Sequence, residues 1–226
     1  MPCVSRWITL RTILFAAALV ASCLARGAAA AAECGSSGEF WAVSTRSLPY
    51  CGDATLAPGA LDCRRYDDRG GWTDVDADAF FAPGESAAPT VLFVHGNRVD
   101  HCTAIHEGRA LGRVLRAAAD GRPYRLVVWS WPADRIGGGA RRDAQVKAAR
   151  SDAQAIYLAE FLRRMPNDAT VNLVGHSFGG RVILGAMHLL GGGTLMGRTL
   201  AEAQSDAPRS IRAVVAAAAM DNASLL

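Results

Sequence analysis

Lysine is almost missing from this chain of 226 residues: Lys147 is the only one, and histidine occurs five times. The other basic residues are arginines, and three of them, Arg6, Arg11 and Arg26, lie in the first 32 positions, where no acidic residue occurs. The rest of the chain therefore has as many acidic as basic residues. A neutral domain without a basic stripe argues against a nucleic-acid partner. The preference for arginine indicates coding bias, and no function follows from it.

Signatures of metal and nucleotide sites are also missing. The chain contains no H-E-x-x-H, no paired C-x-x-C and no G-x-x-x-x-G-K-[ST]. Cys102 and His106 are four residues apart on an expected helix beside His101, and they form the one metal alternative. Gly137–Gly139 has the composition of a flexible loop rather than of an anion cradle. We therefore expect neither a metal nor another cofactor.

The first 32 residues are typical of a secretory signal peptide. A basic start is followed by an apolar run over Ile13–Leu24 and by the alanine tract Ala28–Ala32, which offers several A-x-A cleavage sites. The apolar run is shorter than the roughly 18 residues that a membrane-spanning helix needs, so a permanent transmembrane helix is the weaker alternative. We expect residues 1–32 to be a signal and residues 33–226 to form one domain.

Export changes how the cysteines are interpreted. Val20–Cys23 resembles a bacterial lipobox, in which Cys23 would carry a lipid and tether the domain to a membrane. The expected location is therefore periplasmic, extracellular or lipid-anchored at the cell envelope. In an oxidising compartment an even number of cysteines favours one or two disulfides, and four free thiols are the alternative. The cysteines concerned are Cys34, Cys51, Cys63 and Cys102.

The most informative stretch of the chain is residues 169–190. Thr170–Val174 is a β-branched and aliphatic run, as expected for a buried parallel strand, and Arg181–Leu190 places its apolar residues on one helical face. Between them lies Gly175-His176-Ser177-Phe178-Gly179. This matches the G-x-S-x-G pattern, in which a serine occupies a strained turn between a strand and a helix.

The glycines of this motif have a steric explanation. A side chain at Gly175 or Gly179 would collide with the neighbouring strand or helix as the chain reverses. Ser177 also lies at a helix N-terminus, whose free N–H groups favour a nearby oxyanion. The alternative is a glycine-rich turn with an incidental serine. The strand before it, the helix after it and the further glycine at Gly180 favour a nucleophile.

The remaining segments alternate between strands and helices, which predicts an α/β fold with a mostly parallel sheet and helices on both faces. The segment 39–69 is expected at an edge of the sheet, whereas the strands at 90–94 and 211–219 are expected to be buried. The expected strands cover residues 39–48, 62–69, 90–94, 125–131, 170–174 and 211–219, and the expected helices cover 104–119, 140–164 and 181–190. The helix 140–164 is expected to turn an apolar face inward, formed by Ala144, Ala148, Ala155, Ile156, Ala159 and Leu162.

Two of these strands end in notable residues. Thr90–Val94 is followed by His95-Gly96-Asn97, and a His-Gly turn upstream of a G-x-S-x-G is where a second oxyanion donor is expected, here the N–H of Asn97. His95 is expected to hold that loop in shape. The next strand ends in Trp129-Ser130-Trp131-Pro132, whose aromatic rings either line an acyl pocket or cap the core.

These motifs resemble the α/β-hydrolase family over about Phe40 to Asp221. Val-Leu-Phe-Val-His-Gly-Asn, Trp-Ser-Trp-Pro and Val-Asn-Leu-Val-Gly-His-Ser-Phe-Gly-Gly are similar to a bacterial, lipase-like branch whose role is largely unknown. The resemblance implies Ser177 as nucleophile and the N–H groups of Asn97 and Phe178 as oxyanion donors. It also implies the triad order serine, acid, histidine, with Asp221 at a position that some members use for the acid.

Histidine is where the chain departs from the family. The only histidine after Ser177 is His188, eleven residues along the same helix and so roughly 16 Å away. His176 is expected on the opposite side of the turn, and His101 or His106 would break the family order. We therefore expect the chain to stop after its sixth strand, before its histidine, and to be nearly inert. This would leave the strand 211–219 as an uncovered sheet edge and the domain only marginally folded.

Two functions follow from these observations. The first is an exported serine hydrolase of small-molecule or lipid esters, whose triad histidine is not in this chain. The alternative is a non-catalytic binding or interaction protein that keeps a hydrolase fold.

Overall fold

The computed structural model describes residues 39–50, 56–57, 59–67, 71–82, 88–200 and 210–220. Within them, seven strands form one sheet in the order β3-β2-β1-β5-β4-β6-β7. Strand β2 is antiparallel to both of its neighbours, and the remaining neighbours pair in parallel. The protein is therefore an α/β protein with a mixed, mostly parallel sheet. The strands are β1 (Glu39–Ser44), β2 (Asp62–Asp67), β3 (Gly71–Val75), β4 (Thr90–Val94), β5 (Arg125–Ser130), β6 (Thr170–His176) and β7 (Ser210–Ala216).

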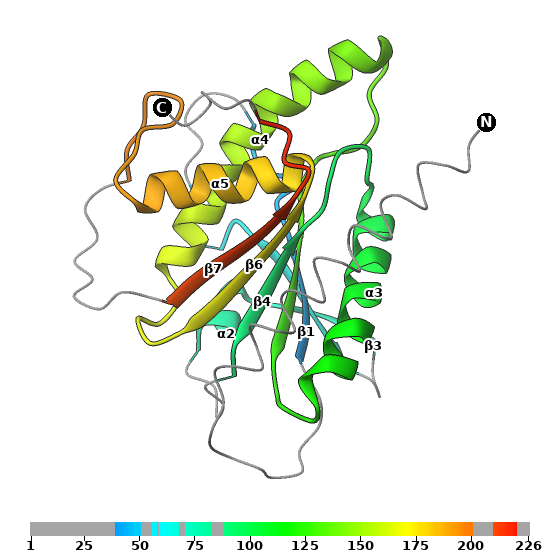
Figure 1. Ribbon diagram of the computed structural model, residues 1–226, viewed down its shortest axis with the longest axis vertical. Helices are drawn as coiled ribbons and strands as arrows, with labels where there is room; N and C mark the ends of the chain where they lie inside the picture. The colour runs from blue at the N-terminus through cyan, green and yellow to red at the C-terminus, as the bar shows by residue number, and fades with distance from the viewer. Residues whose placement is uncertain are drawn as a thin grey trace.

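Helices cover both faces of the sheet, as the alternation of strands and helices predicts. Figure 1 shows α3 on one face, and α4 and α5 together on the other. The core is correspondingly divided into two apolar clusters, a smaller one beneath α3 and a larger one beneath α4 and α5. The helices are α2 (Ala77–Phe81), α3 (His101–Ala119), α4 (Gly139–Arg163) and α5 (Phe178–Leu190).

Strand β4 shows why a continuous apolar run occupies the centre of this sheet. All five of its residues are buried. Side chains alternate along a strand, so Val91 and Phe93 pack into the cluster under α3, while Leu92 and Val94 pack into the one under α4 and α5. A strand whose two faces are both covered is expected to be almost wholly apolar, and β4 confirms the prediction of a buried strand.

Helix α3 begins three residues before its expected start. Asp100 is its N-cap and accepts a hydrogen bond from the Thr103 N–H at 2.7 Å, so the polar residues before Ala104 belong to the first helical turn. At the other end Asp120 adopts a positive φ of 50° and ends the helix. This start places His101 at the edge of the sheet where the parallel strands end.

Four expectations about the fold are wrong. Gly71–Val75 forms β3, so the described sheet has seven strands rather than six, and α2 follows it. β1 is not at the edge, because β2 and β3 lie outside it. None of the seven residues of β7 is buried, because no described strand lies beyond it. The inward face of α4 is polar in its first half rather than formed by alanines, since it buries Asp143, Lys147 and Ser151.

The described helices include none that is long and apolar enough to cross a membrane. The expected signal (residues 1–32), the acylation site Cys23 and the cysteines Cys34 and Cys51 lie outside the described residues. Cys63 and Cys102 are free, the first buried and the second exposed. Burial raises the pKa of the Cys63 thiol to about 11, so this thiol is protonated at neutral pH. The predicted pairing therefore does not join these two cysteines.

Candidate functional site

The direction in which the chain crosses the sheet reverses between β4 and β6. From β4 the chain crosses through α3 to β5 on one side, whereas from β6 it crosses through α5 to β7 on the other. Ligands of open α/β sheets bind outside the carboxyl ends of strands at such a reversal. Val94 and Gly175 are register partners here, so the two segments that follow, His95–Asn97 and His176–Phe178, emerge side by side.

Ser177 occupies the turn between β6 and α5 in an unusual backbone conformation. Its φ is 54° and its ψ is −119°, a combination that costs a non-glycine residue about 1–3 kcal/mol. Four backbone hydrogen bonds hold it there. The Ser177 N–H donates to Ala216 O at 2.9 Å. Its carbonyl accepts from Gly180 N–H at 3.0 Å, from Ala219 N–H at 3.1 Å and from Arg181 N–H at 3.3 Å. Strain kept in this way at a sheet edge is a mark of functional sites.

Two glycines bring the strand ends into contact. A Cβ on Gly179 would lie 2.1 Å from the Val94 carbonyl oxygen, so only glycine lets α5 start against β4. A Cβ on Gly96 would lie 3.0 Å from His176 Nδ1 and 3.4 Å from Ser177 Cβ. The loop after β4 therefore touches the turn that carries Ser177, which is the proximity that the two sequence motifs require.

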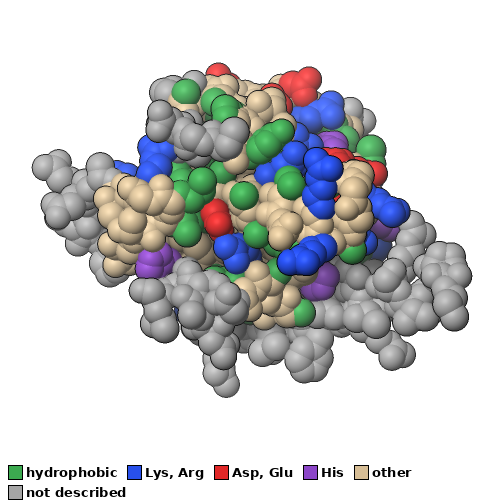
Figure 2. Space-filling view, turned by 90° about the horizontal axis from the view of Figure 1, so that it is seen from above, with side chains coloured by type: hydrophobic (Ala, Val, Ile, Leu, Met, Phe, Trp, Pro, Cys, Tyr) green, Lys and Arg blue, Asp and Glu red, His purple; other side chains and the backbone are tan. Residues whose placement is uncertain are grey.

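The N–H groups of Asn97 and Phe178 are the candidate oxyanion donors. Neither donates a hydrogen bond to an atom of the described chain, and Phe178 is the first residue of α5, whose N-terminal dipole end favours negative charge. Figure 2 looks onto this edge of the molecule, where arginine and acidic side chains both lie at the surface. An oxygen anion next to Ser177 would thus meet N–H donors at the positive end of the α5 dipole.

His95 fixes the start of the loop after β4. Its Nε2 accepts the Trp131 backbone N–H at 3.2 Å, so Nδ1 carries the proton and donates to Gly96 O at 3.0 Å. The Trp131 indole N–H donates to His95 O at 2.9 Å, and the two rings stack. Burial lowers the pKa of His95 to about 3, so the ring is neutral and serves structure rather than proton transfer.

Trp129 and Trp131 belong to the core and do not line a pocket. Both are fully buried, and the Trp129 indole N–H donates to Gln154 Oε1 at 3.2 Å. The acyl-pocket alternative for these rings is therefore excluded.

A buried ion pair on α4 anchors the loop that carries Asn97. Asp143 Oδ2 accepts hydrogen bonds from Asn97 Nδ2 and from Arg98 Nε, both at 2.9 Å, and Asp143 Oδ1 lies 3.3 Å from Lys147 Nζ. Both members of the pair are fully buried. These bonds hold the pKa of Asp143 well below its usual range although burial opposes ionisation.

Sequence reasoning missed this anchor because it assigned α4 an apolar inner face. The available signal was the spacing of Asp143, Lys147 and Ser151, four residues apart, with the chain's only lysine in the middle. Polar residues at this spacing usually form a solvated helix face, so the pattern alone does not reveal a buried network.

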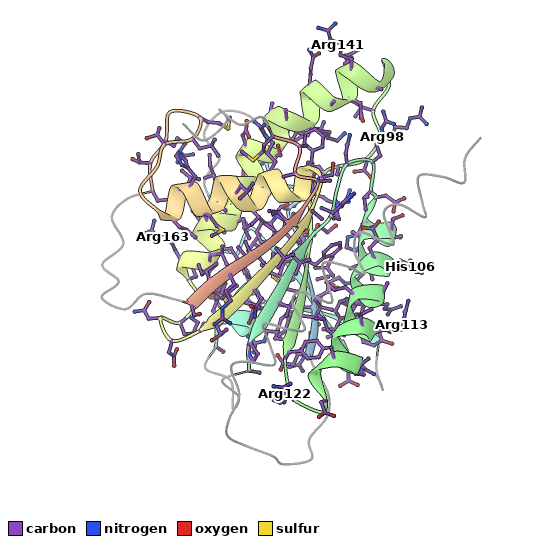
Figure 3. All side chains as sticks on the ribbon, viewed as in Figure 1. Arg98, His106, Arg113, Arg122, Arg141 and Arg163 are labelled. Atoms are coloured by element: carbon purple, nitrogen blue, oxygen red, sulfur yellow. The ribbon has the colours of Figure 1, made fainter. Side chains whose placement is uncertain are left out.

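None of the four other histidines is placed as a base for Ser177. In the part of the chain that the structure describes, no side chain hydrogen-bonds the Ser177 hydroxyl. His176 lies against Gly96, and burial lowers its pKa. His106 points away from the sheet on α3 (Figure 3), and His188 Nε2 lies 3.3 Å from Thr194 O at the far end of α5.

His101 is engaged elsewhere on the same sheet edge. Its Nδ1 is 2.9 Å from Ser130 Oγ, and the same oxygen accepts the Arg46 Nε–H at 2.8 Å. Burial, and then the charges of Arg46 and Arg64, lower the pKa of His101. Ser130 ends β5, two strand positions from β6 and so roughly 10 Å away at the usual strand spacing.

An open cleft of about 480 Å³ lies near His101 rather than over Ser177. It occupies the ends of β1, β2 and β3 at the start of α3, and its wall carries both basic and acidic side chains. It is lined by Ser44, Arg46, Leu61, Asp62, Cys63, Arg64, Asp74, Val75 and His101. Because the strand order places it beyond β4 and β5 from Ser177, it does not lie at the ends of β4 and β6.

The proposed acid, Asp221, lies just beyond Met220 and outside the described residues. Among the residues that are described, no three His, Cys, Asp or Glu side chains gather in a way that could hold a metal ion. Cys102 is exposed, and His101 faces Ser130, so these two do not converge on one point.

The site thus consists of a strained serine turn, a loop packed against it with a free N–H, and a buried anchor beneath that loop. Comparison with models of protein families, with curated proteins and with solved structures finds no match for this chain.

Proposed function

We propose that the protein has an α/β-hydrolase fold and is a serine hydrolase of ester-like acyl substrates, with Ser177 as its nucleophile. The observation that carries this proposal is the Ser177 turn. It has a positive φ, lies between β6 and α5 at the reversal of the strand order, and packs against Gly96 of the neighbouring loop. A strand, a strained serine and a helix in this arrangement are the structural context that the G-x-S-x-G motif requires.

The proposed chemistry begins with attack of Ser177 Oγ on the acyl carbon. The carbonyl oxygen becomes an oxyanion, which accepts hydrogen bonds from the N–H groups of Asn97 and Phe178, while the alcohol leaves with a proton. Water or a second alcohol then attacks the acyl-serine ester. Each oxyanion donor is expected to contribute about 10²- to 10³-fold in rate, since it acts on charge that develops only in the transition state.

The base is the part of this proposal that the described residues do not supply. A serine hydroxyl is a weak nucleophile at neutral pH unless a base takes its proton, and no described histidine contacts Ser177. We propose that Asp221 and a histidine from outside the described residues complete a triad. Without them the rate should be lower by about 10²- to 10⁴-fold, so this chain alone should turn over esters very slowly.

A second candidate is a non-catalytic binding or interaction protein. The absence of a positioned base among the described residues favours it. The two candidates differ in one property, because only a hydrolase has reason to keep an activated oxyanion site beside a reactive serine.

The test is reaction of the purified chain with a fluorophosphonate, followed by intact-mass and peptide analysis. We expect one adduct on Ser177, formed slowly, and none in Ser177→Ala. An unreactive wild-type protein, or labelling that persists in Ser177→Ala, would contradict the nucleophile assignment. Rapid turnover of p-nitrophenyl esters by the chain would contradict the missing base and make His101 or His106 the base instead.

We further propose that the domain is exported and that Cys23 tethers it to a membrane when the lipobox is used. The support is the sequence of residues 1–32 alone. Cell fractionation of the protein expressed with its own N-terminus tests both proposals. Wild-type protein should partition with membranes, and Cys23→Ala should be found in the soluble exported fraction.

A further inference from the structure

We propose that Asp143 is a positioning residue for the oxyanion site: through Asn97 and Arg98 it fixes the loop whose N–H group receives the developing charge. This inference rests on the proposed function, because it assigns a role within the same site. Asp143 touches neither Ser177 nor a substrate position, so it acts through the loop alone.

The contacts of Asp143 converge from three segments. Its Oδ2 accepts from Asn97 Nδ2 and Arg98 Nε of the loop after β4, and its Oδ1 accepts from the Ile136 backbone N–H at 3.1 Å, in the loop after β5. Lys147, one helical turn further along α4, adds the fourth contact. One carboxylate therefore ties together the two loops that lie side by side at the carboxyl ends of β4 and β5.

The loop also needs an anchor, because its backbone is strained. Arg98 has a φ of 60°, which is unfavourable for a residue with a side chain, and its N–H donates to Asn97 Oδ1 at 2.8 Å. The Asn97 side chain thus bonds both the Arg98 backbone and Asp143. These bonds fix the Asn97 side chain and the peptide that follows it, and so restrict the backbone rotation of Asn97 that sets the direction of its own N–H.

Stability of the fold alone does not explain the Asp143–Lys147 pair. Removing two charges from water is costly, and apolar residues of similar volume usually replace such a pair without loss of stability. A buried carboxylate that accepts hydrogen bonds from a loop gives geometric precision that apolar packing does not, and oxyanion donors depend on such precision.

The chain offers a matched control in a second ion pair on the same helix. Asp152 of α4 accepts two hydrogen bonds from Arg181 of α5, at 2.9 and 3.1 Å. This pair links α4 to the helix that carries Ser177 but does not contact the loop after β4. Asp152→Asn therefore removes an α4 carboxylate without touching the proposed anchor.

The first measurement is amide hydrogen exchange by NMR on the wild-type chain and on Asp143→Asn, Asn97→Ala and Asp152→Asn. We expect exchange of the Arg98 amide, whose N–H donates to Asn97 Oδ1, to become on the order of ten-fold faster in the first two variants. Asn97→Ala removes this acceptor, and Asp143→Asn weakens the bond that holds it in place. Exchange within β4 should not change. Asp152→Asn should leave the loop at the wild-type rate. Unchanged loop exchange in both variants would overturn the inference.

The second measurement is the rate of fluorophosphonate labelling at Ser177 as a function of probe concentration. Asp143→Asn and Asn97→Ala should each lower the limiting rate by about ten- to a hundred-fold, since a misplaced donor no longer meets the oxyanion. The concentration that gives half the limiting rate should stay the same. Asp152→Asn should label at the wild-type rate. A faster-exchanging loop with an unchanged labelling rate would mean that Asp143 is merely structural, and would contradict the positioning role.

The double variant Asn97→Ala/Asp143→Asn makes the test stricter. If the two residues act through one contact, the double variant should label no more slowly than the slower single variant. Independent, multiplied losses would contradict a shared mechanism. Should Asp143→Asn fail to fold, Asn97→Ala decides alone, because it breaks the link and leaves the buried pair intact. A wild-type protein that never labels at Ser177 would overturn the proposed function, which distinguishes that failure from a failure of the positioning role.

Discussion

Strands β4 and β7 look alike in sequence but differ sharply in the structure. Both are short apolar runs, and sequence reasoning predicts both to be buried. Every residue of β4 is buried, whereas none of β7 is, and Val215 in β7 is 36% exposed. β4 lies between β5 and β6 with helices on both faces, while β7 has only β6 beside it among the described residues.

The difference shows that the position of a strand in the sheet, rather than its local composition, decides how deeply its side chains are buried. The loop after β4 is held at both ends. His95 is neutral and buried at its start, and Asp143 accepts a hydrogen bond from Asn97. The end of β7 contributes only the Ala216 and Ala219 backbone bonds to the Ser177 turn. The site therefore has a rigid side at β4 and a less buried side at β7.

The largest difference in stability between the β4 side and the β7 side is expected when the first two glycines of α5 are each replaced by alanine. In Gly179→Ala the new Cβ would lie 2.1 Å from the Val94 carbonyl oxygen of β4. The backbone of a central strand cannot shift far enough to relieve this clash. In Gly180→Ala the new Cβ would meet Ala218 Cβ at 3.1 Å, just after β7, where the chain is less buried. We expect a loss of about 3 kcal/mol or more for Gly179→Ala, and under about 1 kcal/mol for Gly180→Ala.

Denaturant unfolding of the two variants checks this prediction. Both positions lie in the first turn of the same helix, so the helix propensity gained from alanine is the same in each. Equal losses would show that the β7 side is as rigid as the β4 side.

A smaller contrast is expected from matched valines in the two strands. Val91 of β4 is 0% exposed, and Val91→Ala should lower the free energy of unfolding by about 2 kcal/mol through lost burial and a cavity. Val215→Ala should change it by less than about 0.5 kcal/mol, because this side chain is already partly in water. Urea titrations of both variants measure these changes in the free energy of unfolding. A costly Val215→Ala would mean that something covers β7 in solution.

The pH dependence of stability gives the third contrast, because the pKa of His95 is about 3 in the folded protein and about 6.5 when unfolded. Below pH 6.5 the His95 side chain binds a proton in the unfolded chain but stays neutral in the folded protein. The free energy of unfolding therefore falls by about 1.4 kcal/mol per pH unit until pH 3. Between pH 7.5 and pH 5 His95 should account for about 2 kcal/mol.

Glu107 on α3 works in the opposite direction. Burial raises its pKa from 4.5 to about 7, so the folded protein gains stability as the pH falls through that window. The contribution of His95 is therefore measured as the difference between wild type and His95→Gln. The wild-type protein should lose more stability on acidification than His95→Gln does. Parallel pH curves would contradict a buried, neutral His95.

Much of the fold could be predicted because strands and helices carry local periodic signals. Thr90–Val94 was delimited correctly, and the ends of β5, β6 and α4 lie within about two residues of expectation. β3 was missed because Gly71–Val75 has little apolar character, and its pairing with β2 supplies what its sequence does not. For β7 the apolar composition predicted burial, whereas the expected edge position predicted exposure, and among the described strands β7 is an exposed edge strand.

The candidate site was predictable only in part, for a similar reason. The motif placed Ser177, and His-Gly placed Asn97, since each motif reflects a local backbone requirement. The contacts of Asp143 join residues 46 apart in sequence, and no local pattern reports such a contact. His101 lies on the correct sheet edge, but its partner Ser130 could not be foreseen from its position in the chain.

The most direct test of a preformed acyl-transfer site is a crystal structure of the Ser177 adduct with a phosphonate. We predict that one phosphoryl oxygen lies about 2.7–3.1 Å from the N–H nitrogens of both Asn97 and Phe178, with the loop after β4 still bonded to Asp143. A phosphoryl oxygen that points into solvent, out of hydrogen-bonding reach of either nitrogen, would contradict the account.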